Sequence, residues 1–319
     1  MESGGTEPAR CSGCMSLPPR TDFWQVGIVP APIATLTNPT VLGGLRDRIT
    51  WLPDPGPWRY LADPFALKRG GVIHVFVEAF DYRTKHAVIE QHEFSSDFVW
   101  RGKSTVLVRP FHLSYPYLVE DGGEIFMIPE SQRAGEIALY RAKKFPNEWV
   151  RETALLTGIR GAEASVIKHE GCWWMFFTIV GPQARDQREL HIAHAQTLTG
   201  PWQLHPSNPI LDNRAGARPG GTPFVGADGK LILPVQDCSR TYGGAIRFLH
   251  FTTLNPSQVA VEHLDATLGG HLVSSTHGEG FHTFAGCGDI TLIDTKRIAR
   301  QWTRYAIDLN RRVKRWMSA

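Results

Sequence analysis

The sequence has no long apolar run and almost no excess of one charge. In 319 residues, 34 Lys and Arg stand against 31 Asp and Glu, for a net charge of +3, which argues against nucleic-acid binding over the whole surface. No stretch approaches the ~20 apolar residues that cross a membrane. The N-terminus also lacks the basic stretch and apolar core of a signal peptide, so we expect a cytoplasmic protein.

Cysteine is scarce, with five residues in the chain. Cys11 and Cys14 form one CxxC pair, whereas a structural zinc site needs four ligands and no second close pair exists. A metal or redox role for this pair stays an alternative. The remaining cysteines are expected to be reduced and buried as small apolar residues: Cys172, Cys238 and Cys287.

What the sequence does contain is a repeat of about 50 residues. In its clearest copy Asp63 precedes Pro64, a Gly70-Gly71 turn follows, and an apolar strand then ends on Glu78. The copies are aligned on Pro64, Pro116, Ser165, Pro219 and Thr283. A period of roughly 50 residues made of strands and glycine turns is typical of a β-propeller. Five copies predict an all-β protein with five blades.

The repeat divides the chain into three regions. Residues 1–21 are rich in Gly, Ser and Pro without periodicity, which predicts a disordered leader. Residues 22–295 are expected to form the propeller, in which the strand at 23–29 closes the ring with the last blade and so removes an open edge. Residues 296–319 are expected to form a basic amphipathic helix.

The C-terminal region combines an apolar stripe with a strong positive charge. Eight basic residues stand against one acidic residue over 296–319. Apolar residues recur at the three- and four-residue spacing of one helix face: Ile298, Trp302, Tyr305, Leu309, Val313 and Trp316. Either the stripe packs on the rim of the propeller, or the helix contacts an anionic membrane peripherally. The second alternative would hold the protein at the inner face of a membrane.

Polar residues recur beside the anchors of the repeat. Because the innermost strand of each blade lines the central channel, these residues are expected to converge at one end of it. The positions just before the anchors are Asp63, Tyr115, Ala164, Arg218 and His282, and the polar residue of blade three is Glu163, one residue before Ala164. This convergence predicts a polar ligand site, although a ring of this kind can also be structural or filled with water.

A second polar set ends the second strand of each copy. It consists of Glu78, Glu130, Thr178, Gln236 and Asp294, and Asp237 adjoins Gln236. Its acidic members either form the rim of a substrate site or bond to backbone amides and arginines. Since a buried unpaired carboxylate is costly, each of them needs a partner.

The blade starts resemble five-bladed propellers of the furanosidase superfamily, such as glycoside hydrolase family 43. The resemblance rests on Ala62-Asp63-Pro64 and implies that Asp63 is a general base and Glu163 a general acid. It also implies an ordered water or a metal ion near His282 and no other cofactor. Tyr115 departs from the family pattern, which has an aspartate in blade two that orients the acid.

A closer resemblance covers most of residues 58–296. It is to the N-terminal propeller-type domain of plant glucosamine inositolphosphorylceramide transferases and of related bacterial proteins. The matching stretches are 60–65, 112–116, 127–131, 217–221 and 236–238. In the plant proteins a separate domain resembles the glycosyltransferase, so the resemblance implies a glycan or glycolipid context for the propeller.

Two functions follow from these observations. The first is an enzyme acting on a glycosidic bond, in which Arg218 binds an anionic group, Tyr115 stacks on a sugar and His282 holds a water or relays a proton. The second is a non-catalytic glycan-binding module in polysaccharide or glycolipid biosynthesis. In both the partner is a carbohydrate or glycolipid and not a nucleic acid. A propeller that serves as a protein scaffold is a further alternative.

Overall fold

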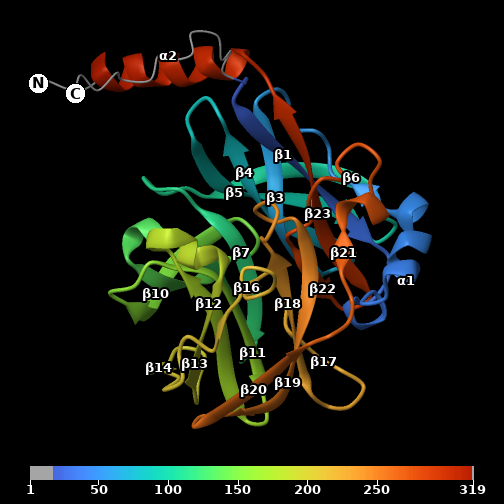
Figure 1. Cartoon of the computed structure of the whole chain (residues 1–319), viewed down its shortest axis with the longest axis vertical. Coiled ribbons are helices and arrows are strands. Elements are labelled where there is room, and N and C mark those ends of the chain that lie inside the picture. The colour runs from blue at the N-terminus through green and yellow to red at the C-terminus, as the bar shows by residue number, and fades with distance from the viewer. Residues whose placement is uncertain (1–16, 318–319) are drawn as a thin grey trace, which may run out of the picture.

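Five antiparallel sheets are arranged around a common centre in the computed structural model, which describes residues 17–317 (Figure 1). Each sheet contains at least four strands, so the predicted five-bladed propeller is confirmed. Most of the predicted leader, 1–16, lies outside the described residues, and strand β1 begins at Arg20.

Blades one to three follow one another along the chain. Blade one contains β3 (Arg59–Arg69), β4 (Val72–Asp81), β5 (His86–Ser95) and β6 (Trp100–Leu107). Blade two contains β7 (Ser114–Asp121), β8 (Glu124–Glu130), β9 (Glu136–Lys144) and β10 (Glu148–Thr157). Blade three contains β11 (Gly161–His169), β12 (Cys172–Ile179), β13 (Glu189–Ala195), β14 (Gln203–Leu204) and β15 (Leu211–Asp212).

Blade four has the most interrupted strands, and blade five combines both ends of the chain. Blade four contains β16 (Arg218–Pro219), β17 (Phe224–Val225), β18 (Leu231–Asp237), β19 (Ala245–Asn255), β20 (Gln258–His263) and β21 (Leu268–Gly269). Blade five contains β22 (Phe284–Cys287), β23 (Ile290–Arg300), β1 (Arg20–Val29) and β2 (Thr50–Trp51). Outside the blades lie α1 (Pro39–Gly44), α2 (Thr303–Met317) and short 3-10 turns.

The ring is closed by β1, which pairs with β23 without interruption from Arg20↔Arg300 to Val29↔Thr291. The prediction that the N-terminal strand closes the last blade is therefore confirmed. β1 is the third strand of that sheet, and the outermost strand is β2. The core lies between the blades, where apolar faces meet, as in the contact between Phe176 and Phe251 with ring centroids 5.1 Å apart. Cys172 and Cys238 are free thiols within this core.

The inner strands of blades one, two and three share a bulge at the same place. The pairing register shifts between Ala62 and Phe65, and equivalent shifts interrupt β7 and β11. Each bulge holds one non-glycine residue at positive φ: Asp63 at 52°, Tyr115 at 45° and Glu163 at 55°. Glu163, and not Ala164, therefore holds the repeated position in blade three, which corrects the alignment on Ser165 by one residue.

The C-terminal helix is shorter than predicted and its apolar stripe is not covered. Since β23 continues to Arg300, α2 begins at Thr303 and not at Lys296. Trp302 is 52% exposed and Leu309 63% exposed, so the expectation that the stripe packs on the rim of the propeller is wrong. Across 17–317 no helix is both long and apolar enough to span a bilayer.

Candidate functional site

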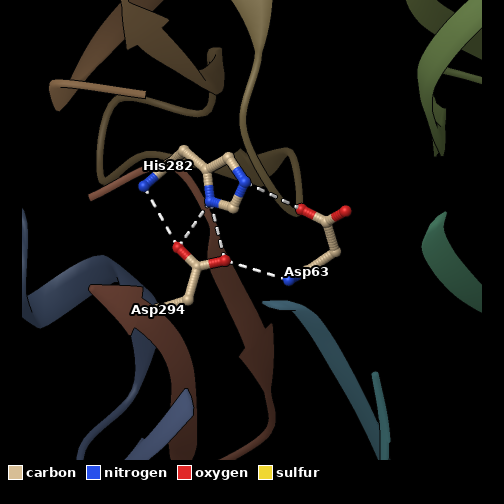
Figure 2. A group of neighbouring side chains, drawn as sticks. All are labelled: Asp63, His282 and Asp294. Atoms are coloured by element: carbon tan, nitrogen blue, oxygen red, sulfur yellow. Dashed lines mark hydrogen bonds and ion pairs between the residues drawn. The ribbon is translucent and has the colours of Figure 1, made fainter. Parts of the chain in front are cut away.

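Asp63, His282 and Asp294 form a buried network at one end of the central channel (Figure 2). His282 lies between the carboxylates: its Nδ1 is 2.7 Å from Asp294, and its Nε2 is 3.3 Å from Oδ1 of Asp63. The imidazole also stacks on Trp24, with ring centroids 3.7 Å apart. The ring is therefore held on its edges by two carboxylates and on one face by an indole.

Both carboxylates also accept hydrogen bonds from backbone amides near the bulges. The amide of Asp63 donates to Asp294 at 2.9 Å, and the amide of Tyr115 donates to Asp63 at 3.2 Å. The hydroxyl of Thr283 donates to the other oxygen of Asp63 at 3.2 Å. Burial raises the pKa of the Asp63 carboxyl well above its usual range, and the nearby carboxylates, Glu163 first among them, raise it further.

Glu163 forms a buried ion pair with Arg218. Its Oε1 is 2.6 Å from Nη2 of Arg218, while its Oε2 has no hydrogen-bond partner among the described residues. Arg218 also donates to the backbone oxygen of Asp186 at 2.7 Å, and its guanidinium lies over the ring of Tyr242 at 5.1 Å. Burial raises the pKa of the Glu163 carboxyl, and the charge of Arg218 acts against this shift.

Tyr115 lies at the bulge of blade two, but its side chain is not available to a ligand. The residue is 0% exposed, and its hydroxyl lies 2.8 Å from Oγ of Ser165 and accepts the amide of Gly221 at 2.7 Å. The hydroxyl thus joins blade two to blades three and four. The expectation that Tyr115 stacks on a sugar is wrong, because its phenol ties blades together in the core.

Glu78 and Glu130 extend the polar centre toward blades one and two. Oε1 of Glu78 is 3.2 Å from Nε2 of His112, so this carboxylate has the partner that its burial requires. Glu130 lies 3.9 Å from Arg218. Burial raises the pKa of Glu130 to about 7, against the opposing charge of Arg218.

Asp237 is the one predicted site residue that lies apart from the network. Its carboxylate accepts the amide of Ser239 at 2.9 Å and the hydroxyl of the same residue at 2.5 Å. It therefore caps the exposed turn after β18.

Several residues of the site were missed by the sequence analysis. Asp294 belongs to the second polar set, and of its two predicted roles the structure confirms bonding to backbone amides, while its additional contact with the His282 ring was not predicted. Trp24 comes from the closing strand, Tyr242 from a turn before β19, and Asp186 from a 3-10 helix (Pro182–Gln187). None of these three residues occupies a position of the repeat, so the repeat could not predict them.

The same network has a donor set that suits a metal ion. Ligand atoms of Asp63, His282 and Asp294 all lie within 4.8 Å of one another. Nε2 of His282 and Oδ1 of Asp63 are 3.3 Å apart, a separation that two ligands of one cation can adopt. The bond from Nδ1 to Asp294 is the type that orients a metal-binding histidine. The residues present thus fit either a cation or the direct contacts between the imidazole and the two carboxyl groups.

A cavity of about 490 Å³ opens between blade five and blade one, within the ~300–1,000 Å³ typical of small-molecule sites. Aromatic walls are supplied by Phe23, Trp24 and Trp58, and cationic groups by Arg59 and Arg297. Trp24 belongs to the cavity lining and to the network, but it is only 5% exposed, because its indole stacks on His282 and Lys296 lies over the ring.

The fold defines the class of protein, a five-bladed propeller whose fold is similar to that of solved glycoside hydrolases. The α-L-arabinofuranosidase PaAbf62A from Podospora anserina matches 75% of this chain and 81% of its own, with a TM-score of 0.56 and 12% identity. The family 117 glycoside hydrolase Zg3597 from Zobellia galactanivorans matches 74% and 84%, with a TM-score of 0.53 and 12% identity. At these identities the likeness establishes the fold alone.

The chain belongs to the family described as glucosamine inositolphosphorylceramide transferase 1, N-terminal, whose model matches residues 51–273. The rice (Oryza sativa subsp. indica) protein glucosamine inositolphosphorylceramide transferase 1 is 33% identical over 236 residues, 72% of this chain. The Arabidopsis thaliana protein of the same name is 31% identical over 263 residues. The chain spans 30% of the length of the rice relative. The resemblance drawn from the sequence motifs is confirmed.

Proposed function

We propose that this propeller is a glycan-binding module that takes the headgroup of a glycolipid in the cavity between blades five and one. The observation that carries the proposal is the lining of this cavity, in which the half-buried Phe23 and Trp58 stand with Arg59 and Arg297. Aromatic faces pack against the apolar faces of sugars, and guanidinium groups bind phosphate in a bidentate manner.

The ligand class follows from the lining and from the family. The lining also contains one carboxylate, that of Asp54, beside the two guanidinium groups. Arg59 is partly neutralised by Asp81 at 3.1 Å, whereas Arg297 lies over Phe23 at 5.2 Å. The name of the plant relatives points to a lipid that joins glucosamine to an inositol phosphate. A phosphorylated cyclitol that bears an amino sugar would match this lining: its phosphate suits the guanidinium groups, its amino group suits the carboxylate, and its sugar face suits the aromatic rings.

The second candidate is cleavage or transfer of a glycosidic bond at Asp63 and Glu163. Its support is the raised pKa of both carboxyls together with the unpartnered Oε2 of Glu163, since a general acid must carry a proton near neutral pH. It ranks second because Arg218 binds Glu163 at 2.6 Å and both Asp63 and Glu163 are buried.

Titration of the full chain with myo-inositol monophosphate and with glucosamine, followed by NMR, tests the proposal. We expect the phosphate to bind, and Trp58→Ala to weaken it by about tenfold because an aromatic wall is lost. The matched control is Trp100→Ala, since Trp100 lies on β6 outside the cavity and is 43% exposed.

The same preparation, incubated with aryl glycosides, tests the second candidate. Turnover that Asp63→Asn abolishes, with no binding in the cavity, would replace the proposal by the enzymatic alternative. Absence of both binding and turnover, or equal binding by the Trp58→Ala and wild-type chains, would contradict the cavity as the site.

A further inference from the structure

Helix α2 turns an apolar stripe toward solvent. In the described part of the chain, thirteen large apolar side chains are exposed, and five of them lie within residues 302–316. Their exposed fractions rise to 83% at Trp316. The stripe consists of Trp302, Tyr305, Leu309, Val313 and Trp316. Monomeric soluble proteins rarely concentrate apolar surface in this way unless it is a contact site.

The opposite, polar face of α2 holds the helix against the propeller. The guanidinium of Arg304 lies over the ring of Tyr82 at 4.1 Å, and Arg311 donates to the backbone oxygen of Tyr82 at 3.0 Å. Asp308 bonds both arginines, at 3.2 Å and 2.8 Å. A surface helix normally buries its apolar face on the protein and presents its polar face to solvent. Here the contacts fix the reverse orientation.

The charge of the helix selects among possible partners. Between Thr303 and Met317 there are five Arg or Lys residues and one Asp, and Arg312 and Lys314 remain exposed beside the stripe. A second copy of the chain would bring an equally basic helix, which would repel the first. An anionic lipid surface instead attracts the charges, accepts the apolar stripe and suits Trp and Tyr at its polar boundary.

We propose that α2 lies in the plane of an anionic membrane and seats the propeller on it. The helix extends across one end of the molecule, next to the ends of β1 and β23 (Figure 1). Arg297 and Gln301, which come just before α2, line the cavity between blades five and one. A membrane held by the helix would therefore lie beside the cavity mouth. The membrane contact does not depend on what the cavity binds.

Sedimentation with vesicles tests the contact directly. The full chain is mixed with phosphatidylcholine vesicles that contain or lack phosphatidylserine. We expect it to pellet with the anionic vesicles only, and less as salt shortens the Debye length from about 10 Å at 0.1 M to about 3 Å at 1 M. Leu309→Glu should weaken the partition by at least about tenfold, since it removes an apolar contact and adds a repelled charge.

Matched variants separate the contact from changes in folding. Leu204→Glu makes the same exchange on β14, where Leu204 is 53% exposed, and should leave the partition unchanged. Arg312→Gln and Lys314→Gln should each reduce binding to anionic vesicles by about fivefold and leave the thermal unfolding curve unaltered. Equal pelleting with both vesicle types, no pelleting, or a soluble dimer that Leu309→Glu dissociates would each overturn the proposal.

Discussion

At the scale of single residues, carboxylates of one blade bond the backbone of the next. Asp294 of blade five accepts the amide of Asp63, and Asp63 of blade one accepts the amide of Tyr115. The bulges interrupt the ladder where these amides lie, and a buried amide without a partner is costly. Asp63 thus has a structural role that requires no substrate, which is why a buried aspartate in this position does not by itself indicate an enzyme.

Asp294→Asn should lower the free energy of unfolding by about 3 kcal/mol. The carboxylate accepts three backbone amides, those of Asp63, His282 and Thr283, and also bonds the imidazole of His282. An asparagine would turn an NH₂ group toward some of these donors. Urea unfolding measures the loss. The control is Asp289→Asn, where the carboxylate is 77% exposed and pairs with Lys68; equal effects in the two variants would remove the structural role of Asp294.

At the scale of elements, the sequence predicts the blades well and the local register less well. The apolar strands and glycine turns repeat because every blade has the same form, so the five sheets follow from the spacing. In blades one and two a proline directly follows the bulge residue, whereas in blade three the next two residues are Ala164 and Ser165. Without the proline, the repeat predicts Ala164 at the bulge, one residue after the observed Glu163.

The repeat does not determine how the side chains at its positions are oriented. The pattern correctly predicts that Asp63 and His282 lie at one end of the channel. It also predicts that the Tyr115 side chain faces the same ligand site, which it does not. The bulge sends the Tyr115 phenol across the ring to Gly221, a contact that depends on the backbone of blade four. In the same way, the contacts of Arg304 and Arg311 with Tyr82 decide which face of α2 is exposed, and spacing alone leaves that choice open.

The closing strand offers a test at this scale. A Cβ on Gly27 of β1 would stand 2.8 Å from Ile49 and 2.9 Å from Trp51. Glycine at this position therefore allows β2, and Ile49 just before it, to pack closely on β1. Gly27→Ala should reduce the free energy of unfolding by about 1–3 kcal/mol. Gly44→Ala is the matched control: nothing lies within 4 Å of its added methyl group, and the helix it ends should gain up to about 1 kcal/mol. Thermal unfolding of both variants distinguishes them, and similar midpoints would argue against a tight closure.

At the scale of the whole molecule, the ring gathers acidic groups from separate blades into one buried centre. Burial raises the pKa of Asp63, Glu130 and Glu163 above their usual range. When the folded-state pKa of a carboxyl is the higher one, the folded state keeps a proton that the unfolded chain releases. Stability is then greatest below the unfolded pKa and falls as pH rises toward the folded pKa. The propeller should therefore be most stable in mildly acidic solution.

Glu130 allows this pH dependence to be isolated, because its pKa rises from 4.5 to about 7 and its side chain is only 11% exposed. A shift of that size corresponds to about 3 kcal/mol. Below pH 4.5 the wild type and Glu130→Gln should differ little, since both then carry a neutral side chain at this position. As pH rises through 7 the wild type should lose about 3 kcal/mol relative to the variant. Urea unfolding at a series of pH values measures the difference, and two parallel curves would show that folding leaves the pKa of Glu130 unchanged.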